Sequence, residues 1–169
     1  ARILSGLVSS CGRFMGNWIN VTFGSREWRD PVYPMVIEKL TTPIEPGSER
    51  DLFWQEQVYA RAADILRQHP GDASGFWGWK LPETTMVVSE ITRYFPKADF
   101  IHLIRHPIES CCRRTHMTSR RKKPIGAACM DASYKHIGRP LEYMETDSEV
   151  MHNAAGWVMQ TDMAVAALN

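Results

Sequence analysis

The chain has 169 residues, 44% of them hydrophobic, and carries 20 Lys and Arg residues against 19 Asp and Glu. This length suits one domain with a sizeable core, and the ordinary apolar fraction excludes a disordered chain. The net charge of +1 excludes a generally basic nucleic-acid-binding protein, and no apolar run reaches the roughly 18–20 residues that span a bilayer. With no secretory signal pattern and only four irregularly spaced cysteines, we expect a cytoplasmic protein with reduced thiols.

The chain is predicted to begin with a strand–loop–helix unit. Residues 2–5 form the expected strand, residues 6–13 a loop of small side chains, and apolar residues at helical spacing predict a helix over 14–19. The free N–H groups of such a loop and the dipole of the following helix suit a phosphate. Because no Lys follows Gly12, the loop departs from the pattern GxxxxGK[ST], and an ordinary strand–helix turn is the alternative.

The middle of the chain is predicted to contain an irregular segment and a second strand–helix unit. Several Pro and Gly residues make 24–49 extended and irregular, and an amphipathic pattern predicts a helix over 51–68. Residues 76–80 suit a strand, and a helix is predicted over 84–95, with Pro82 near its start.

The remaining residues continue the alternation. The apolar run 100–104 predicts a strand, which residues 105–107 close, and another helix is expected after them. Residues 120–148 are predicted to form a charged loop region, and residues 154–168 a last helix. Strands separated by helices indicate an α/β fold, in which a parallel sheet lies between layers of helices.

Two features of the second half favour an anionic ligand. Arg105 follows a predicted parallel strand, at the sheet edge where α/β folds bind ligands, and its guanidinium suits a phosphate. Over residues 105–123, basic side chains outnumber the single Glu109 seven to one, which indicates a polyanionic ligand. A structural salt bridge and a solvated helix face are the respective alternatives. No aromatic residues interleave the basic run, which disfavours nucleic acid, and no His and Cys spacing indicates a metal.

One longer pattern is distinctive. Residues 78–82 are Gly-Trp-Lys-Leu-Pro, and after a predicted helix residues 94–107 are Tyr-Phe-Pro-Lys-Ala-Asp-Phe-Ile-His-Leu-Ile-Arg-His-Pro. This order resembles the passage "K-x-P, helix, F-P-x-A-x-F-I-x-L-x-R-x-P" of the sulfotransferases that use 3′-phosphoadenosine 5′-phosphosulfate (PAPS). Residues 155–160 are similar to a Trp-bearing helix of that family. The resemblance implies a single P-loop-like sulfotransferase domain over residues 1–169, a three-layer parallel sheet flanked by helices and incomplete at its C-terminus.

The resemblance also implies an activity. A sulfuryl group would pass from PAPS to a hydroxyl or amine of a small-molecule or glycan acceptor, with 3′,5′-bisphosphoadenosine as product and no metal. A non-catalytic adenine-nucleotide-binding domain of the same fold is the first alternative, because Ser9 replaces the basic residue of the family's phosphosulfate loop. A divergent P-loop kinase is the second, although the Lys that it needs is missing.

The family's binding motifs transfer to this chain with two departures. The loop of residues 6–13 is implied to hold the 5′-phosphosulfate, with Arg13 a possible substitute for the missing basic residue, and Arg105 to hold the ribose 3′-phosphate. Arg113 stands where the family has a Ser, and Ser110 is the nearest hydroxyl. The residues implied to bind PAPS are Ser9, Ser10, Cys11, Gly12, Arg13, Phe14, Arg105, Ser110 and Arg113.

Three residues are implied to take part in catalysis. In several branches of the family a carboxylate shortly after the first helix deprotonates the acceptor, which points to Glu27, with Asp30 second. Lys80 matches the family Lys and, with Arg13, would stabilise the charge on the transferring group. A surface carboxylate is the alternative for Glu27.

Overall fold

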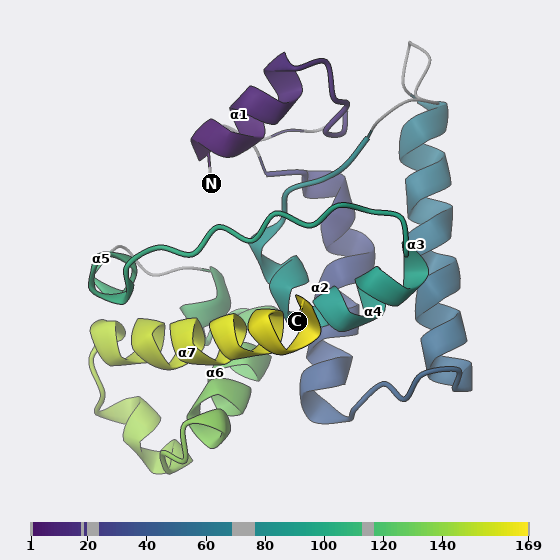
Figure 1. Ribbon diagram of the computed structural model, residues 1–169. Coiled ribbons are helices and arrows are strands. Elements are labelled where there is room, and N and C mark those ends of the chain that lie inside the picture. Colours follow the sequence, from purple (N-terminus) through teal and green to yellow (C-terminus); the bar gives the residue numbers. More distant parts are fainter. Residues whose placement is uncertain (1, 18, 20–23, 69–76, 113–116, 169) are drawn as a thin grey trace. The chain divides into compact units, whose positions relative to one another are not determined.

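The computed structural model describes residues 2–17, 19, 24–68, 77–112 and 117–168. Over these residues it contains helices and no β-strand (Figure 1). The α-helices are α1 (Arg2–Ser10), α2 (Arg29–Thr41), α3 (Glu49–Arg67), α4 (Val88–Tyr94), α5 (Pro107–Cys111), α6 (Pro124–His136) and α7 (Glu149–Leu168). The 3-10 helices are η1 (Arg26–Trp28), η2 (Pro82–Val87), η3 (Met117–Ser119) and η4 (Leu141–Glu145).

The predicted α/β fold with a three-layer parallel sheet is therefore wrong for this structure. Residues 100–104 carry no helix, but no ladder pairs them with another described segment, and Ile101 and Leu103 are 68% and 50% exposed. A strand needs a neighbour to bond its N–H and C=O groups, and a local apolar run cannot supply one. Of the expected strand 76–80, only Trp77 forms an isolated bridge, and residue 76 lies outside the described residues.

The N-terminal unit also differs from its prediction. The expected strand over 2–5 lies in α1, where Leu4 and Val8, four residues apart, follow helical spacing. The expected helix over 14–19 is not formed over its described residues, because Phe14 instead pairs in a parallel bridge with Trp77.

Two segments predicted to be irregular contain helices. Within 24–49, α2 tolerates Pro31 in its first turn, where a helix has no use for that N–H. Pro34 lies deeper and removes one helical hydrogen bond, which burial of Val32 and Met35 offsets. Within 120–148, α6 begins at Pro124, again at a position suited to Pro, and η4 follows it.

Other helices confirm their predictions. The side chain of Ser48 caps α3 by accepting a hydrogen bond from Asp51 N, and α3 buries one face that includes Val58 and Ile65. The predicted helix 84–95 is present as η2 followed by α4, which ends before Pro96. The helix expected after the 100–104 run is α5, which begins at Pro107, and the last helix is α7, which begins five residues earlier than predicted.

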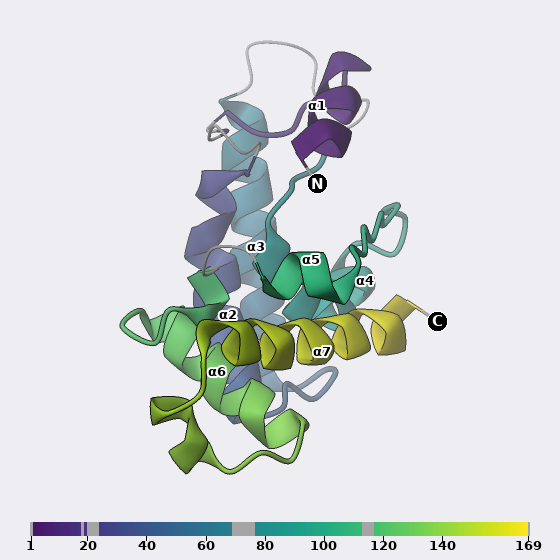
Figure 2. The same cartoon turned by 90° about the vertical axis from the view of Figure 1, so that its left-hand side faces the viewer.

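The chain divides into two compact units. Unit 1 comprises Ala1–Tyr33 and Glu45–Pro82, and unit 2 comprises Pro34–Ile44 and Glu83–Asn169. In unit 1, α3 packs against η1. In unit 2, α7 packs against α4, α5 and α6 (Figure 2). The core of unit 2 gathers residues from α6, η4 and α7, namely Met130, Tyr134, Met144 and Ala155. Among the helices described, none has the length and apolar character to cross a membrane.

Candidate functional site

Ser25 joins the segments that carry the predicted catalytic residues of unit 1. Its buried hydroxyl donates to the carbonyl of Met15 at 2.9 Å and accepts from the N–H of Lys80 at 3.1 Å. Its own N–H donates to the carbonyl of Lys80 at 2.9 Å, and Gly78 N donates to the Phe14 carbonyl at 2.9 Å. These bonds fix the backbone of Lys80 beside the segment that leads into η1.

Glu27 lies in η1, two residues after Ser25, and its carboxylate is held by a hydrogen bond from the segment that contains Asn17. The backbone N–H of Asn17 donates to Glu27 Oε1 at 2.7 Å, and the Asn17 side-chain amide donates to the Ile65 carbonyl of α3 at 3.1 Å. Gly16 precedes this contact with a φ of 105°, and a Cβ at that position would overlap the Glu27 carboxylate. The positive φ favours a glycine at position 16, and the missing Cβ leaves room for the Glu27 carboxylate.

Three tryptophan rings form a stack that includes Trp28 of η1. Trp28 is 1% exposed, and its ring stacks on Trp79 with centroids 4.0 Å apart. Trp77 stacks on both rings at 6.1 Å. Such pairs contribute about 0.5–1.5 kcal/mol each beyond the area that they bury. Because Glu27 precedes Trp28 directly, this stack restricts the backbone that carries the carboxylate.

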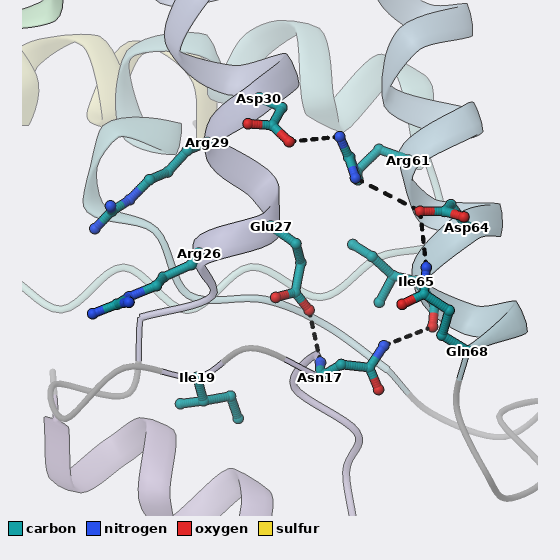
Figure 3. Close-up of a pocket in the computed structure, with 10 residues that line it drawn as sticks. All are labelled: Asn17, Ile19, Arg26, Glu27, Arg29, Asp30, Arg61, Asp64, Ile65 and Gln68. Atoms are coloured by element: carbon teal, nitrogen blue, oxygen red, sulfur yellow. Dashed lines mark hydrogen bonds and ion pairs between the residues drawn. The ribbon is translucent and has the colours of Figure 1, made fainter.

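A cavity of about 750 Å³ opens beside Glu27, between η1, the start of α2 and the C-terminal half of α3 (Figure 3). Its charged lining residues are Arg26, Glu27, Arg29, Asp30, Arg61 and Asp64. Arg61 lies between two carboxylates, 2.6 Å from Asp30 and 3.6 Å from Asp64. The cavity thus combines a positioned carboxylate with cationic side chains, which suits a small polar molecule.

A model of the sulfotransferase family matches residues 21–160, which are 140 of the 169 residues and include Glu27, Lys80 and Arg105. The chain belongs to the sulfotransferase family. This membership confirms the resemblance carried by the motifs over residues 78–107. Comparison of the chain with curated proteins and with solved structures gave no match.

The predicted phosphosulfate loop of this sulfotransferase precedes the matched range and forms the end of α1. Ser9 and Ser10 belong to the helix, and Gly12, with a φ of 78°, follows its last turn. The N–H groups of Cys11, Gly12 and Arg13 donate to carbonyls within α1, and Phe14 pairs with Trp77. The expected strand–loop–helix geometry is therefore absent from this segment, and the binding of PAPS by residues 9–14 stays a prediction.

The predicted 3′-phosphate residues belong to unit 2. Arg105 is exposed, two residues before the start of α5, and forms no ion pair with another described residue. Ser110 lies in α5, where its N–H donates to the His106 carbonyl at 3.1 Å. Arg113 lies outside the described residues. The role of these residues in the sulfotransferase stays a prediction.

The sequence did not reveal the residues that surround Glu27. Gly16 and Asn17 form a Gly-Asn pair, which signals a turn but no catalytic role. Arg61 and Asp64 stand on the polar face of α3, where charged residues are ordinary. Only the packing of α3 against η1 brings them to the same cavity. No group of three or more His, Cys, Asp or Glu that could hold a metal ion occurs over the described ranges.

Proposed function

We propose that this sulfotransferase moves a sulfuryl group from PAPS to a hydroxyl or amine of a small-molecule or glycan acceptor. The family match over residues 21–160 carries the proposal, because it includes both Glu27 and Lys80. The cavity beside Glu27 supports it further, since an acceptor must reach its base. A cytoplasmic location, inferred from the cysteine pattern, is part of the proposal.

Glu27 acts as the general base in this mechanism. One oxygen of its carboxylate accepts the N–H of Asn17, and the group lines the cavity, so a hydroxyl bound there can give it a proton. The acceptor oxygen forms a bond to sulfur as the bond from sulfur to the 5′-phosphate oxygen breaks. 3′,5′-Bisphosphoadenosine leaves with the electron pair of that bond.

Cationic side chains stabilise the transfer. Charge spreads over the peripheral oxygens of the sulfuryl group in the transition state, so fixed cations lower the barrier without covalent chemistry. Lys80 is assigned this role because it matches the Lys of the family's motif, and hydrogen bonds with Ser25 hold its backbone. Arg13 is assigned a second contact with the sulfuryl group, and Arg105, Ser110 and Arg113 hold the ribose 3′-phosphate.

Calorimetric titration with 3′,5′-bisphosphoadenosine tests the nucleotide site. We expect binding that needs the 3′-phosphate, so AMP and ATP with Mg²⁺ bind at least tenfold more weakly. Arg105→Ala should weaken binding of the bisphosphate by about 10- to 100-fold, because it removes a charge-assisted hydrogen bond. Arg93→Ala is the matched control, since Arg93 is an exposed arginine of the same unit. Equal affinity for AMP would contradict PAPS as the donor.

Transfer of labelled sulfate from PAPS to a panel of phenols, amines and sugars tests the activity. Glu27→Gln keeps the size of the side chain and removes the base, and it should lower kcat about 10²- to 10⁴-fold with little change in bisphosphate affinity. Binding of the nucleotide with no transfer to any acceptor would favour the non-catalytic nucleotide-binding alternative. Transfer of phosphate from ATP with Mg²⁺ would favour the kinase.

A further inference from the structure

Arg26 and Arg29 line the cavity beside Glu27 and take no part in the ion pairs of Arg61. We propose that Arg26 and Arg29 bind an anionic group of the acceptor, so that this sulfotransferase prefers hydroxyl compounds that carry a carboxylate or a sulfate ester. The inference rests on the proposed function in taking Glu27 as the group that faces the acceptor hydroxyl.

The charges of the cavity separate into two sets. Arg61 is neutralised by the carboxylates of Asp30 and Asp64. Arg26 and Arg29 also line the cavity, and neither forms an ion pair with any residue in the described part of the chain. An anion that enters the cavity therefore meets two cations whose charge is not already balanced by a neighbouring carboxylate.

Arg26 and Arg29 are placed to act on the same group. They are three residues apart across the continuous turn from η1 into α2, a spacing that puts two side chains on one helical face. Figure 3 shows both side chains extending in the same direction, whereas the Glu27 carboxylate points toward Asn17. Two planar guanidinium groups offer paired N–H donors that match the oxygens of a carboxylate or sulfate.

Arg29 also carries a donor that lacks an acceptor. Its Nε is buried and has no hydrogen-bond partner among the described residues, although its guanidinium carbon lies 5.9 Å above the centre of the Tyr33 ring. A buried N–H without an acceptor is costly, and native proteins rarely leave one without a purpose. An oxyanion bound between Arg26 and Arg29 would supply the acceptor.

The anion belongs to the acceptor rather than to PAPS. A base takes its proton from the acceptor, so the acceptor hydroxyl occupies the Glu27 side of the cavity. The donor reaches that point with its sulfuryl group alone, because its phosphates lie on the far side of sulfur from the attacking oxygen. With the acceptor hydroxyl at Glu27, the rest of the acceptor occupies the rest of the cavity, where Arg26 and Arg29 lie.

Matched pairs of acid and amide test this inference. The pairs are 4-hydroxybenzoate with 4-hydroxybenzamide, and glucuronate with glucuronamide, in which only the charge differs. We expect at least one acid to bind the wild type tenfold or more tightly than its amide, measured by titration followed by NMR. Arg26→Gln with Arg29→Gln should abolish this preference and leave the affinity for 3′,5′-bisphosphoadenosine unchanged. Arg50→Gln with Arg93→Gln, two exposed arginines that do not line the cavity, is the matched control.

The outcomes separate the inference from the proposed function. A preference for acids that the double variant loses, without sulfate transfer to any compound, would support the anion site and contradict the sulfotransferase mechanism. Equal binding of acids and amides by the wild type would overturn the anion site, whether or not transfer occurs. An unchanged preference in the double variant, with folding verified by circular dichroism, would also overturn it. A parallel loss of bisphosphate affinity would assign the arginines to the donor instead.

Discussion

The backbone N–H of Asn17 donates a hydrogen bond of 2.7 Å to Oε1 of Glu27. The same residue donates its side-chain amide to the carbonyl of Ile65, so the candidate base is connected through one residue to the backbone of α3. A carboxylate fixed in this way keeps its orientation toward the cavity, which general-base catalysis requires. The contact depends on Gly16, which allows the chain to pass directly beside the carboxylate.

Gly16→Ala should therefore act on catalysis through Glu27. The new methyl group would overlap Glu27 Oε1 and displace the carboxylate, and we expect kcat to fall tenfold or more with an unchanged affinity for 3′,5′-bisphosphoadenosine. Gly47→Ala is the matched control, because Gly47 has a φ of 76° but open space around its Cα. Both variants carry the strain of a positive φ, and only the first contacts the base. Steady-state kinetics that show equal losses in both variants would contradict a positioning role for Gly16.

Ser25→Ala should lower both the free energy of unfolding and kcat. The variant removes a donor to Met15 and an acceptor for Lys80 in a buried setting, so we expect a loss of about 1–3 kcal/mol in the free energy of unfolding. We also expect a lower kcat, because the backbone of Lys80 is released.

Ser48→Ala provides the comparison for Ser25→Ala. It removes the cap of α3, which costs about 1 kcal/mol, but Ser48 has no bond to Lys80 or Glu27. Urea unfolding and kcat, measured on both variants, show whether Ser25→Ala loses more activity than its loss of stability explains. A kcat that falls in proportion to stability in both would show that Ser25 has no special relation to Lys80.

Local signals in the sequence were sufficient for helices with clear boundaries. The apolar spacing over 51–68 and over 84–95, and Pro96 after the second of these runs, each depend only on residues that are close together in the sequence. The membership in the sulfotransferase family was predictable for a similar reason, since its motif over 78–107 is continuous in sequence.

Strands and the cavity could not be predicted in this way. Whether the apolar run 100–104 forms a strand depends on a partner segment distant in sequence, and the run itself contains no information on that partner. The ion pair of Arg61 with Asp30 could not be predicted either, because the two residues are 31 positions apart and come together only when α3 packs against η1. For α2, the prolines suggested a break, but burial of its apolar residues decided the outcome.

The four cysteines should differ in reactivity toward thiol reagents. Burial raises the pKa of Cys129 to about 12, with a further contribution from Glu83, and burial also raises the pKa of Cys111. Because the thiolate is the reactive form, both should stay unmodified at pH 8 in the folded protein. Cys11 and Cys112 are exposed and should react first.

Mass spectrometry after labelling with dithionitrobenzoate identifies which cysteines react. Unfolding in urea should release the remaining two, which is the positive control for the reagent. Since Cys11 belongs to the predicted phosphosulfate segment, 3′,5′-bisphosphoadenosine should slow its labelling. Fast labelling of Cys129 in the folded protein would show that unit 2 opens far more readily than its packed core indicates.

The stability of unit 2 should depend on pH through Asp147. Hydrogen bonds from Arg139 lower the pKa of Asp147 below its ordinary value of 3.8, and the hydroxyl of Tyr134 adds a bond of 2.8 Å. Burial, followed by this bond, raises the pKa of Tyr134 to about 12, so the hydroxyl remains a donor throughout the acid range.

The sign of the pH dependence follows from the lowered pKa. The folded state binds the proton of Asp147 less tightly than the unfolded state, so the stabilisation is complete above about pH 5 and is lost as pH falls below 4. Asp147→Asn should be less stable than the wild type at pH 7 and should show a shallower decline of unfolding free energy between pH 5 and about 2. Glu145→Gln removes the exposed partner of Arg121 and should change the stability at pH 7 and its decline with pH only a little. In 0.5 M salt, which screens exposed charges, these changes should be smaller still. Equal pH slopes for Asp147→Asn and the wild type, measured by urea unfolding, would contradict this assignment.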